Sequence, residues 1–121
     1  MAQYVPPDWP EGVHPPGSDG WEGTAVAWLL GLVPEYRQYT MVCRHPAILA
    51  SIARHLVPGS VEGARDGYRT VRTDLAEHAP PHALDAALTA YRAGGRRLAA
   101  AERAVDQVER ALRGEVFKPS L

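Results

Sequence analysis

The chain has 121 residues, of which 45% are hydrophobic and 22% charged, with a formal net charge of −1. This composition is typical of one soluble globular domain (residues 1–121) and counts against a strongly basic nucleic-acid-binding protein. The longest apolar run, residues 25–33, is about half of the ~18 residues that a membrane-spanning helix needs. The first ten residues lack the basic and apolar segments of a secretory signal, and a lone Cys43 suits a reducing compartment. We therefore expect a cytoplasmic protein with no membrane contact.

The N-terminal segment, residues 1–18, is predicted to be an extended acidic arm. Five prolines in the first 20 residues fix φ and remove N–H donors, which excludes a helix. A disordered tail is the alternative, but disordered segments are usually poor in aromatic residues, and this one contains Tyr4 and Trp9. Residues 1–33 carry four carboxylates and no lysine or arginine. We expect the arm to lie along the more basic remainder of the chain, with Trp9 as its anchor.

Short helices are expected within residues 19–57. Asp19 and Glu22 have the spacing of a capping box, which predicts a helix from residue 19 to about Leu32. Pro34 ends that helix and can open a second one, which runs to about Arg44. The helical pattern then continues from residue 46 to residue 78. Pro58 removes a backbone hydrogen bond within this stretch, which can either kink or break a helix. The sequence therefore leaves open one kinked helix or two helices.

Residues 60–113 are predicted to form a long antiparallel helical hairpin, around which the fold is organised. An apolar ladder recurs every seven residues, and mostly small residues follow three places behind its rungs. The rungs are Leu84, Tyr91, Leu98, Val105 and Leu112, and the followers are Ala87, Gly94, Ala101 and Val108. This pattern is the seam of a helix that packs lengthwise against another helix. Residues 79–81, Ala-Pro-Pro, form the turn between the two helices.

The predicted fold class is therefore all-α: a long hairpin, two short N-terminal helices, a Pro-rich arm and a tail of residues 114–121. Alanines beside the ladder make the apolar arc of the last helix wider than a two-helix contact requires. The N-terminal helices or a second copy of the chain must cover the excess. We therefore expect that the chain can form a homodimer through this Ala-rich face.

A glycine stripe adds a further prediction. Gly59, Gly63 and Gly67 are spaced four residues apart, which gives a helix one smooth face. Close approach of another backbone, such as the N-terminal arm, is the first interpretation. A ligand groove is the alternative.

Catalytic, cofactor and metal sites are not indicated. The sequence has no HExxH or CxxC motif, and Cys43 has no evident base and orienting group. Glu102, Asp106 and Glu109 alternate with arginines on the last helix, so we expect them to face solvent. We therefore expect a protein that is not an enzyme.

A run of arginines is the main charge feature. Residues 36–61 contain no acid, and arginines continue beyond them; the series is Arg37, Arg44, Arg54, Arg65, Arg69 and Arg72. With Trp9 these are the candidate partner-binding residues. The sequence favours a non-enzymatic protein–protein interaction or regulatory module. The alternative is a regulator that binds nucleic acid or a phosphorylated ligand through the Arg37–Arg72 face, although no known DNA- or RNA-binding motif accompanies it.

Overall fold

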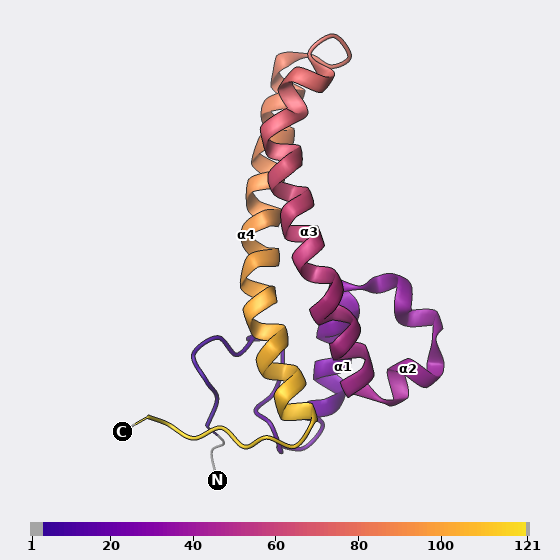
Figure 1. The fold of residues 1–121 in the computed structure, drawn as a ribbon, viewed down its shortest axis with the longest axis vertical. Coiled ribbons are helices and arrows are strands. Elements are labelled where there is room, and N and C mark those ends of the chain that lie inside the picture. The colour runs from indigo at the N-terminus through magenta and orange to yellow at the C-terminus, as the bar shows by residue number, and fades with distance from the viewer. Residues whose placement is uncertain (1–3, 121) are drawn as a thin grey trace.

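The computed structural model describes residues 4–120, which form an all-α fold dominated by one hairpin (Figure 1). Helix α1 (Trp21–Leu32) is followed by the 3-10 helix η1 (Pro34–Gln38) and the short helix α2 (Thr40–Arg44). The long helices α3 (Pro46–Leu75) and α4 (Pro81–Leu112) then run antiparallel. The predicted fold class is confirmed. None of the helices in this part of the chain is long and apolar enough to cross a lipid bilayer.

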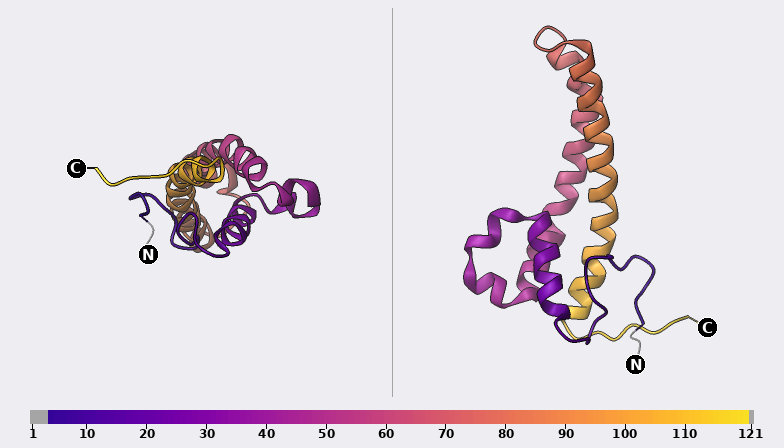
Figure 2. Two further views of the ribbon diagram at one scale, coloured as in Figure 1. Left: turned by 90° about the horizontal axis from the view of Figure 1, so that it is seen from below. Right: turned by 180° about the vertical axis from the view of Figure 1, so that it is seen from behind.

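The hairpin is longer than everything that packs on it. With 30 and 32 residues, α3 and α4 each extend about 45–48 Å. Helix α1, η1, α2 and the arm all gather near the end of the hairpin that lies away from its turn (Figures 1 and 2). The largest fully buried side chains lie at this base: Leu29, Leu49, Val57, Val105 and Val108. Most of the hydrophobic core therefore lies at one end of the molecule.

The first helix does not use the predicted capping box. Helix α1 begins at Trp21, and its N-cap is Gly20, which has φ 73°. No side chain makes a capping hydrogen bond at this end of the helix. The chain turns sharply into the helix at this glycine, a conformation that a residue with a Cβ rarely adopts. Asp19 is thereby placed one residue too early to cap the helix, so that prediction was wrong.

The predicted second helix is also interrupted. Tyr39 adopts a non-helical conformation with φ −92° and ψ 86°, and it separates η1 from α2. The sequence from Tyr36 to Cys43 is rich in aromatic and β-branched residues, which have low helix propensity. Local sequence therefore does not sustain one helix here, and the two short elements form a side lobe on α3.

Helix α3 is a single helix that begins at Pro46, so the hairpin starts 14 residues earlier than residue 60, where we predicted it. Pro58 lies inside the helix without dividing it. Proline removes one backbone hydrogen bond, and position 58 is exposed, so water can hydrate the freed carbonyl. The end of α4 is as expected: Gly114 adopts φ 99°, and the Glu115 N–H donates to the Arg110 carbonyl at 3.0 Å.

The arm lies on the base of the hairpin, with Trp9 as its anchor, as expected. The Trp9 ring centroid is 6.2 Å from those of both Trp21 and Phe117. The Trp9 indole N–H donates to the Val13 carbonyl at 2.9 Å, and Val13 is itself buried. The tail returns to this cluster because the Arg110 guanidinium lies over the Phe117 ring. The arm and the tail thus close one end of the core.

A substitution at the seam tests the position of the core. Val105 is fully buried, so Val105→Glu places a carboxylate among apolar side chains and should lower the free energy of unfolding by about 3 kcal/mol or more. Ala93 is exposed on the same helix, and Ala93→Glu should cost about 0.5 kcal/mol or less. Urea denaturation measures both values. Equal midpoints would contradict the observed register.

A substitution in the arm tests its docking. Trp9→Ala removes the ring shared by Trp21 and Phe117, and we expect a stability loss of about 2 kcal/mol. The Tm should fall by about 8 °C. Tyr39→Ala is the control, because Tyr39 is half exposed in the side lobe. An unchanged Tm for Trp9→Ala would mean that the arm does not contribute to stability in solution.

Candidate docking surface on the free hairpin

Residues 62–98 form a two-helix projection without a third layer, here called the free hairpin. Within it only Val71 and Leu84 are buried. Tyr68, Tyr91 and Leu75, by contrast, remain 37%, 38% and 43% exposed. Two helices bury only the rows of side chains that face each other, so the flanking rows stay in contact with solvent. The free hairpin therefore presents apolar side chains along its edges.

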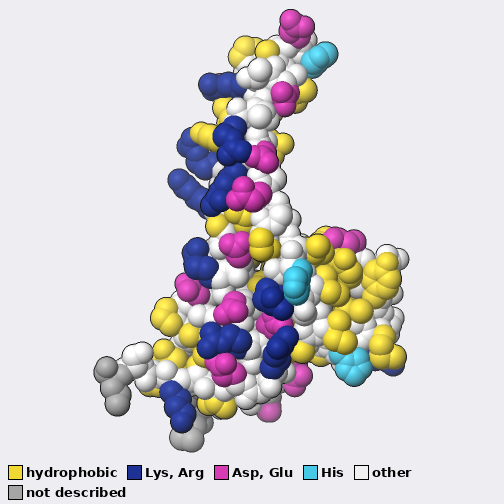
Figure 3. All heavy atoms as spheres, in the orientation of Figure 1, with side chains coloured by type: hydrophobic (Ala, Val, Ile, Leu, Met, Phe, Trp, Pro, Cys, Tyr) yellow, Lys and Arg dark blue, Asp and Glu magenta, His cyan; other side chains and the backbone are white. Residues whose placement is uncertain are grey.

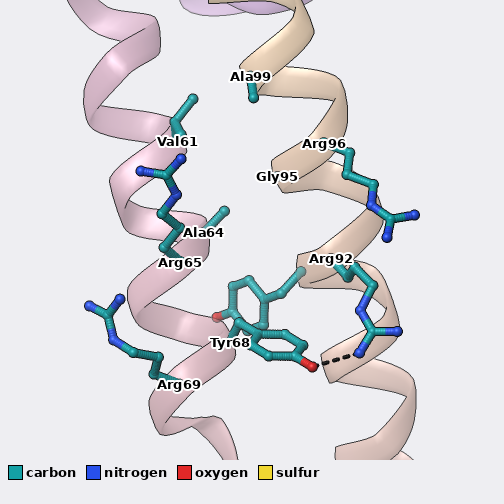
Figure 4. Close-up of a pocket in the computed structure, with 10 residues that line it drawn as sticks. Val61, Ala64, Arg65, Tyr68, Arg69, Arg92, Gly95, Arg96 and Ala99 are labelled. Carbon is teal, nitrogen blue, oxygen red and sulfur yellow. Dashed lines mark hydrogen bonds between the residues drawn. The ribbon is translucent and has the colours of Figure 1, made fainter.

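One edge carries a groove between α3 and α4, here called the tyrosine–arginine groove (Figure 4). Its volume is about 450 Å³, and its lining residues come from both helices: Val61, Ala64, Arg65, Tyr68, Arg69, Tyr91, Arg92, Gly95, Arg96 and Ala99. The Tyr68 ring lies between the helices, the Tyr91 ring lies against Gly67 of α3, and the arginines extend outward from each helix. An apolar floor is thus bordered by positive charge on both sides.

Glycine and arginine hold the two tyrosine rings in place. A Cβ atom at Gly67 would collide with the Tyr91 ring, so the ring occupies space that only glycine leaves open. Arg92 donates a hydrogen bond to the Tyr68 hydroxyl at 2.6 Å, and its guanidinium lies 5.4 Å from the Tyr68 ring centroid. The rings therefore form a fixed floor that is open to solvent.

The glycine stripe has a different role from the one predicted. Only Gly67 is closely approached, and its neighbour is Tyr91 of α4 rather than the N-terminal arm. A Cβ at Gly59 or Gly63 would meet open space. The arm lies instead beside α1 and the lower part of α4, where Trp9 and Gly12 line a separate groove with Trp28.

On the free hairpin, the arginines of α4 differ from those of α3 in their partners. Arg65 pairs with Glu62 at 2.8 Å, and Arg69 pairs with Asp66, both within one turn of α3. For Arg92, Arg96 and Arg97, no carboxylate oxygen of residues 4–120 lies within 4 Å. The segment of α4 between Asp85 and Glu102 contains these three arginines and no acid. Figure 3 shows basic side chains gathered along one side of the projecting hairpin.

The opposite edge is uncharged, and we call it the alanine edge. It lines a shallow groove of about 450 Å³ with Ser60, Ala64, Ala87, Ala90, Tyr91, Gly94 and Leu98. At the base of the hairpin, Ala101, Ala104 and Ala111 of the predicted wide apolar arc are buried. Further along, Ala86, Ala90, Ala93 and Ala100 stay exposed. The excess arc is therefore covered at the base of the hairpin and open along its free part.

The structure separates the arginines of the predicted basic face. Arg37 and Arg44 lie on η1 and α2 in the side lobe, whereas the other four follow α3. Eighteen residues of helix place Arg54 and Arg72 about 27 Å apart. Arg72 forms an ion pair with Asp85 of α4 at 2.7 Å. Arg54 shares a small groove with Arg110 and Arg113 of α4. Arg65 and Arg69 share the tyrosine–arginine groove with Arg92 and Arg96, which were not predicted as site residues.

Glu109 does not face solvent, so that prediction was wrong. Its side chain is 5% exposed and pairs with Arg54 of α3 and with Arg113, the latter at 2.7 Å. Position 109 lies four residues after Val105 and therefore shares the seam face of α4. A buried carboxylate is tolerated only when it is paired. Arg54 consequently has a structural role, as the ion-pair partner of the buried Glu109.

Other reactive groups are dispersed. No cluster of three or more His, Cys, Asp or Glu residues within residues 4–120 could hold a metal ion. The Cys43 thiol is half buried and lies 3.6 Å from the carbonyl oxygen of Tyr36. The side lobe also exposes Tyr39 and Met41, and the first turn of α3 exposes Ile48; exposure of these apolar side chains was not predicted.

The protein thus has an all-α fold with a projecting two-helix hairpin. No protein-family model matches the chain, and comparison with curated proteins and with solved structures found no significant match. Its function is therefore inferred from the described surface alone.

The Arg54–Glu109 pair yields a stability prediction. Arg54→Met leaves the buried carboxylate with only Arg113, so the free energy of unfolding should fall by about 1–3 kcal/mol. Arg65→Met breaks an exposed pair one turn apart and should cost about 0.5 kcal/mol or less. Adding Glu109→Met to Arg54→Met should recover stability. Urea denaturation of all three variants checks this order, and equal losses for the two single variants would contradict it.

Proposed function

We propose that the protein is a non-enzymatic, cytoplasmic protein–protein interaction module and that its docking surface is the free hairpin. The observation that supports this proposal is the exposure of Tyr68 and Tyr91 on a projection that lacks a third layer. Rows of apolar side chains on an otherwise polar surface are typical of interaction sites. A partner helix laid along either edge would complete a three-helix packing arrangement.

The arrangement of the molecule favours binding on the projection over binding at the base. At the base, α1 and the arm already cover the hairpin, and the arm is held by Trp9. The free hairpin projects away from the described parts of the arm and the tail (Figure 2). A partner can therefore reach both edges without displacing any element of the fold.

Self-association is one form of the same proposal. The alanine edge is uncharged, and its small side chains at Ala87, Ala90 and Gly94 permit close approach of a second helix. A second copy could place its own alanine edge there. Both chains would then use the same surface in a symmetric dimer interface.

Binding of nucleic acid or a phosphorylated ligand is the second candidate, but its support is weaker. Of the predicted arginines, Arg54, Arg65, Arg69 and Arg72 all form ion pairs within the chain. A polyanion would have to compete with those carboxylates. The arginines that remain without an ion pair on α4 are the feature that keeps this candidate in consideration.

Site-specific photocrosslinking in the native cell tests the proposal. A photoreactive amino acid at Ala90, on the free hairpin, should capture partner protein or a second copy of the chain. The same amino acid at Met41, in the side lobe, should capture much less. Crosslinking at Met41 with none at Ala90 would contradict the proposal and move the docking surface to the side lobe. Products at Ala90 that disappear after nuclease treatment would favour nucleic-acid binding instead.

A further inference from the structure

We infer that the tyrosine–arginine groove binds an acidic amphipathic helix of a partner protein. This inference rests on the proposed function, and it names the chemistry of the partner and the edge on which it docks. The groove combines an apolar floor with four bordering arginines, and such a surface fits an apolar stripe flanked by carboxylates.

The spacing of the arginines matches the repeat of a helix. Arg65 and Arg69 lie four residues apart on α3, and Arg92 and Arg96 lie four residues apart on α4. Each pair is therefore separated by about 6 Å along its helix axis. Carboxylates at positions i and i+4 of a docked helix repeat at the same distance. A helix lying lengthwise in the groove can present one such pair to each row of arginines.

The floor of the groove suits a helix packed against it. Between the two tyrosine rings and the base, the apolar lining consists of Val61, Ala64, Gly95 and Ala99, and the last three have small side chains or none. A third helix can approach α3 and α4 closely at these positions. The rings of Tyr68 and Tyr91 then supply the larger apolar contact, because both remain more than one-third exposed.

The charges select an acidic partner. Arg92 and Arg96 have no ion pair within the described chain, whereas Arg65 and Arg69 pair only with exposed carboxylates of their own helix. A partner carboxylate would supply a charge-assisted hydrogen bond to α4 without breaking any existing ion pair. A basic or neutral helix would leave the arginines at the border of the groove without carboxylate partners.

The same charges argue against two other occupants. A second copy that docked through its own tyrosine–arginine groove would place arginine rows opposite each other, which is repulsive. A nucleic acid would bring a phosphate row past Glu62 and Asp66, which lie beside the arginines of α3. An acidic helix can position separate carboxylates and bury its apolar stripe on the tyrosines.

Peptide binding to the full chain tests the inference. The probe is a labelled helical peptide of about 18 residues, held helical by side-chain crosslinks, with a leucine stripe flanked by glutamates. The matched peptide replaces every glutamate with glutamine. We expect fluorescence anisotropy to show binding about tenfold tighter for the glutamate peptide at ~50 mM salt, with most of this difference lost at ~300 mM.

Variants of the groove make the test specific. The double variant Arg92→Ala/Arg96→Ala should weaken binding of the glutamate peptide about tenfold. Arg37→Ala/Arg44→Ala removes the same charge from the side lobe and should leave binding unchanged. Arg92→Glu/Arg96→Glu should reject the glutamate peptide and gain affinity for a lysine-flanked version. That gain cannot come from a misfolded chain.

Three outcomes would overturn the inference. The two peptides could bind equally, the side-lobe variant could weaken binding as much as the groove variant, or a single-stranded RNA of equal charge could bind more tightly than the glutamate peptide. If crosslinking at Ala90 still captures a partner protein while any of these holds, only the acidic helix is rejected and the proposed function stands. Ala90 lies on the alanine edge, so both are rejected only if crosslinking fails at Ala90 and also at Ala99, which lines the tyrosine–arginine groove.

Discussion

A pair of packed helices can bury only the side chains that they turn toward each other, and this constraint governs the whole structure. The α3–α4 hairpin is long enough for a continuous seam, yet residues from other elements cover only its base. Where that cover exists, Val105 and Val108 are fully buried. Where it ends, the same seven-residue ladder continues with Tyr91, which is 38% exposed. One sequence pattern therefore produces a core at one end and an open surface at the other.

The base gains its cover from segments that cannot form a core by themselves. The Pro-rich arm has no regular secondary structure, but Trp9 joins it to α1 through Trp21 and to the tail through Phe117. On the other side of the seam, Glu109 is buried with Arg54 as its partner. A buried ion pair contributes less to net stability than an apolar pair of similar size, but its geometry is specific. It fixes α4 against α3 at one position.

The features predicted correctly from the sequence are those that a regular repeat specifies. The ladder from Leu84 to Leu112 identified α4, and the Ala-Pro-Pro turn identified the direction of the hairpin. The errors arose where one local signal competed with another. Asp19 and Glu22 had capping spacing, but the turn at Gly20 decided where α1 begins. Pro58 was no such error, because the sequence left open one kinked helix or two helices, and α3 runs through Pro58 as one helix.

The candidate site was harder to predict, because it depends on which residues of two antiparallel helices meet. Arginines close in sequence, such as Arg37 and Arg44, were grouped with those of α3, yet they lie in a separate lobe. Arg92 and Arg96 are distant from Arg65 in the sequence and share its groove. Pairing the two helices outward from the turn, residue by residue, would have brought them together. The burial of Glu109 likewise required knowing that Arg54 faces it.

The contact between Trp9 and Phe117 links the two ends of the chain. Opening the tail removes one face of the pocket around Trp9, and opening the arm removes the surface on which Phe117 rests. The two ends should therefore detach together, as one cooperative unit, with slow amide hydrogen exchange in both or in neither. Cleavage within either segment would then require both segments to open together. Resistance to proteolysis is thus a property that the arm and the tail share.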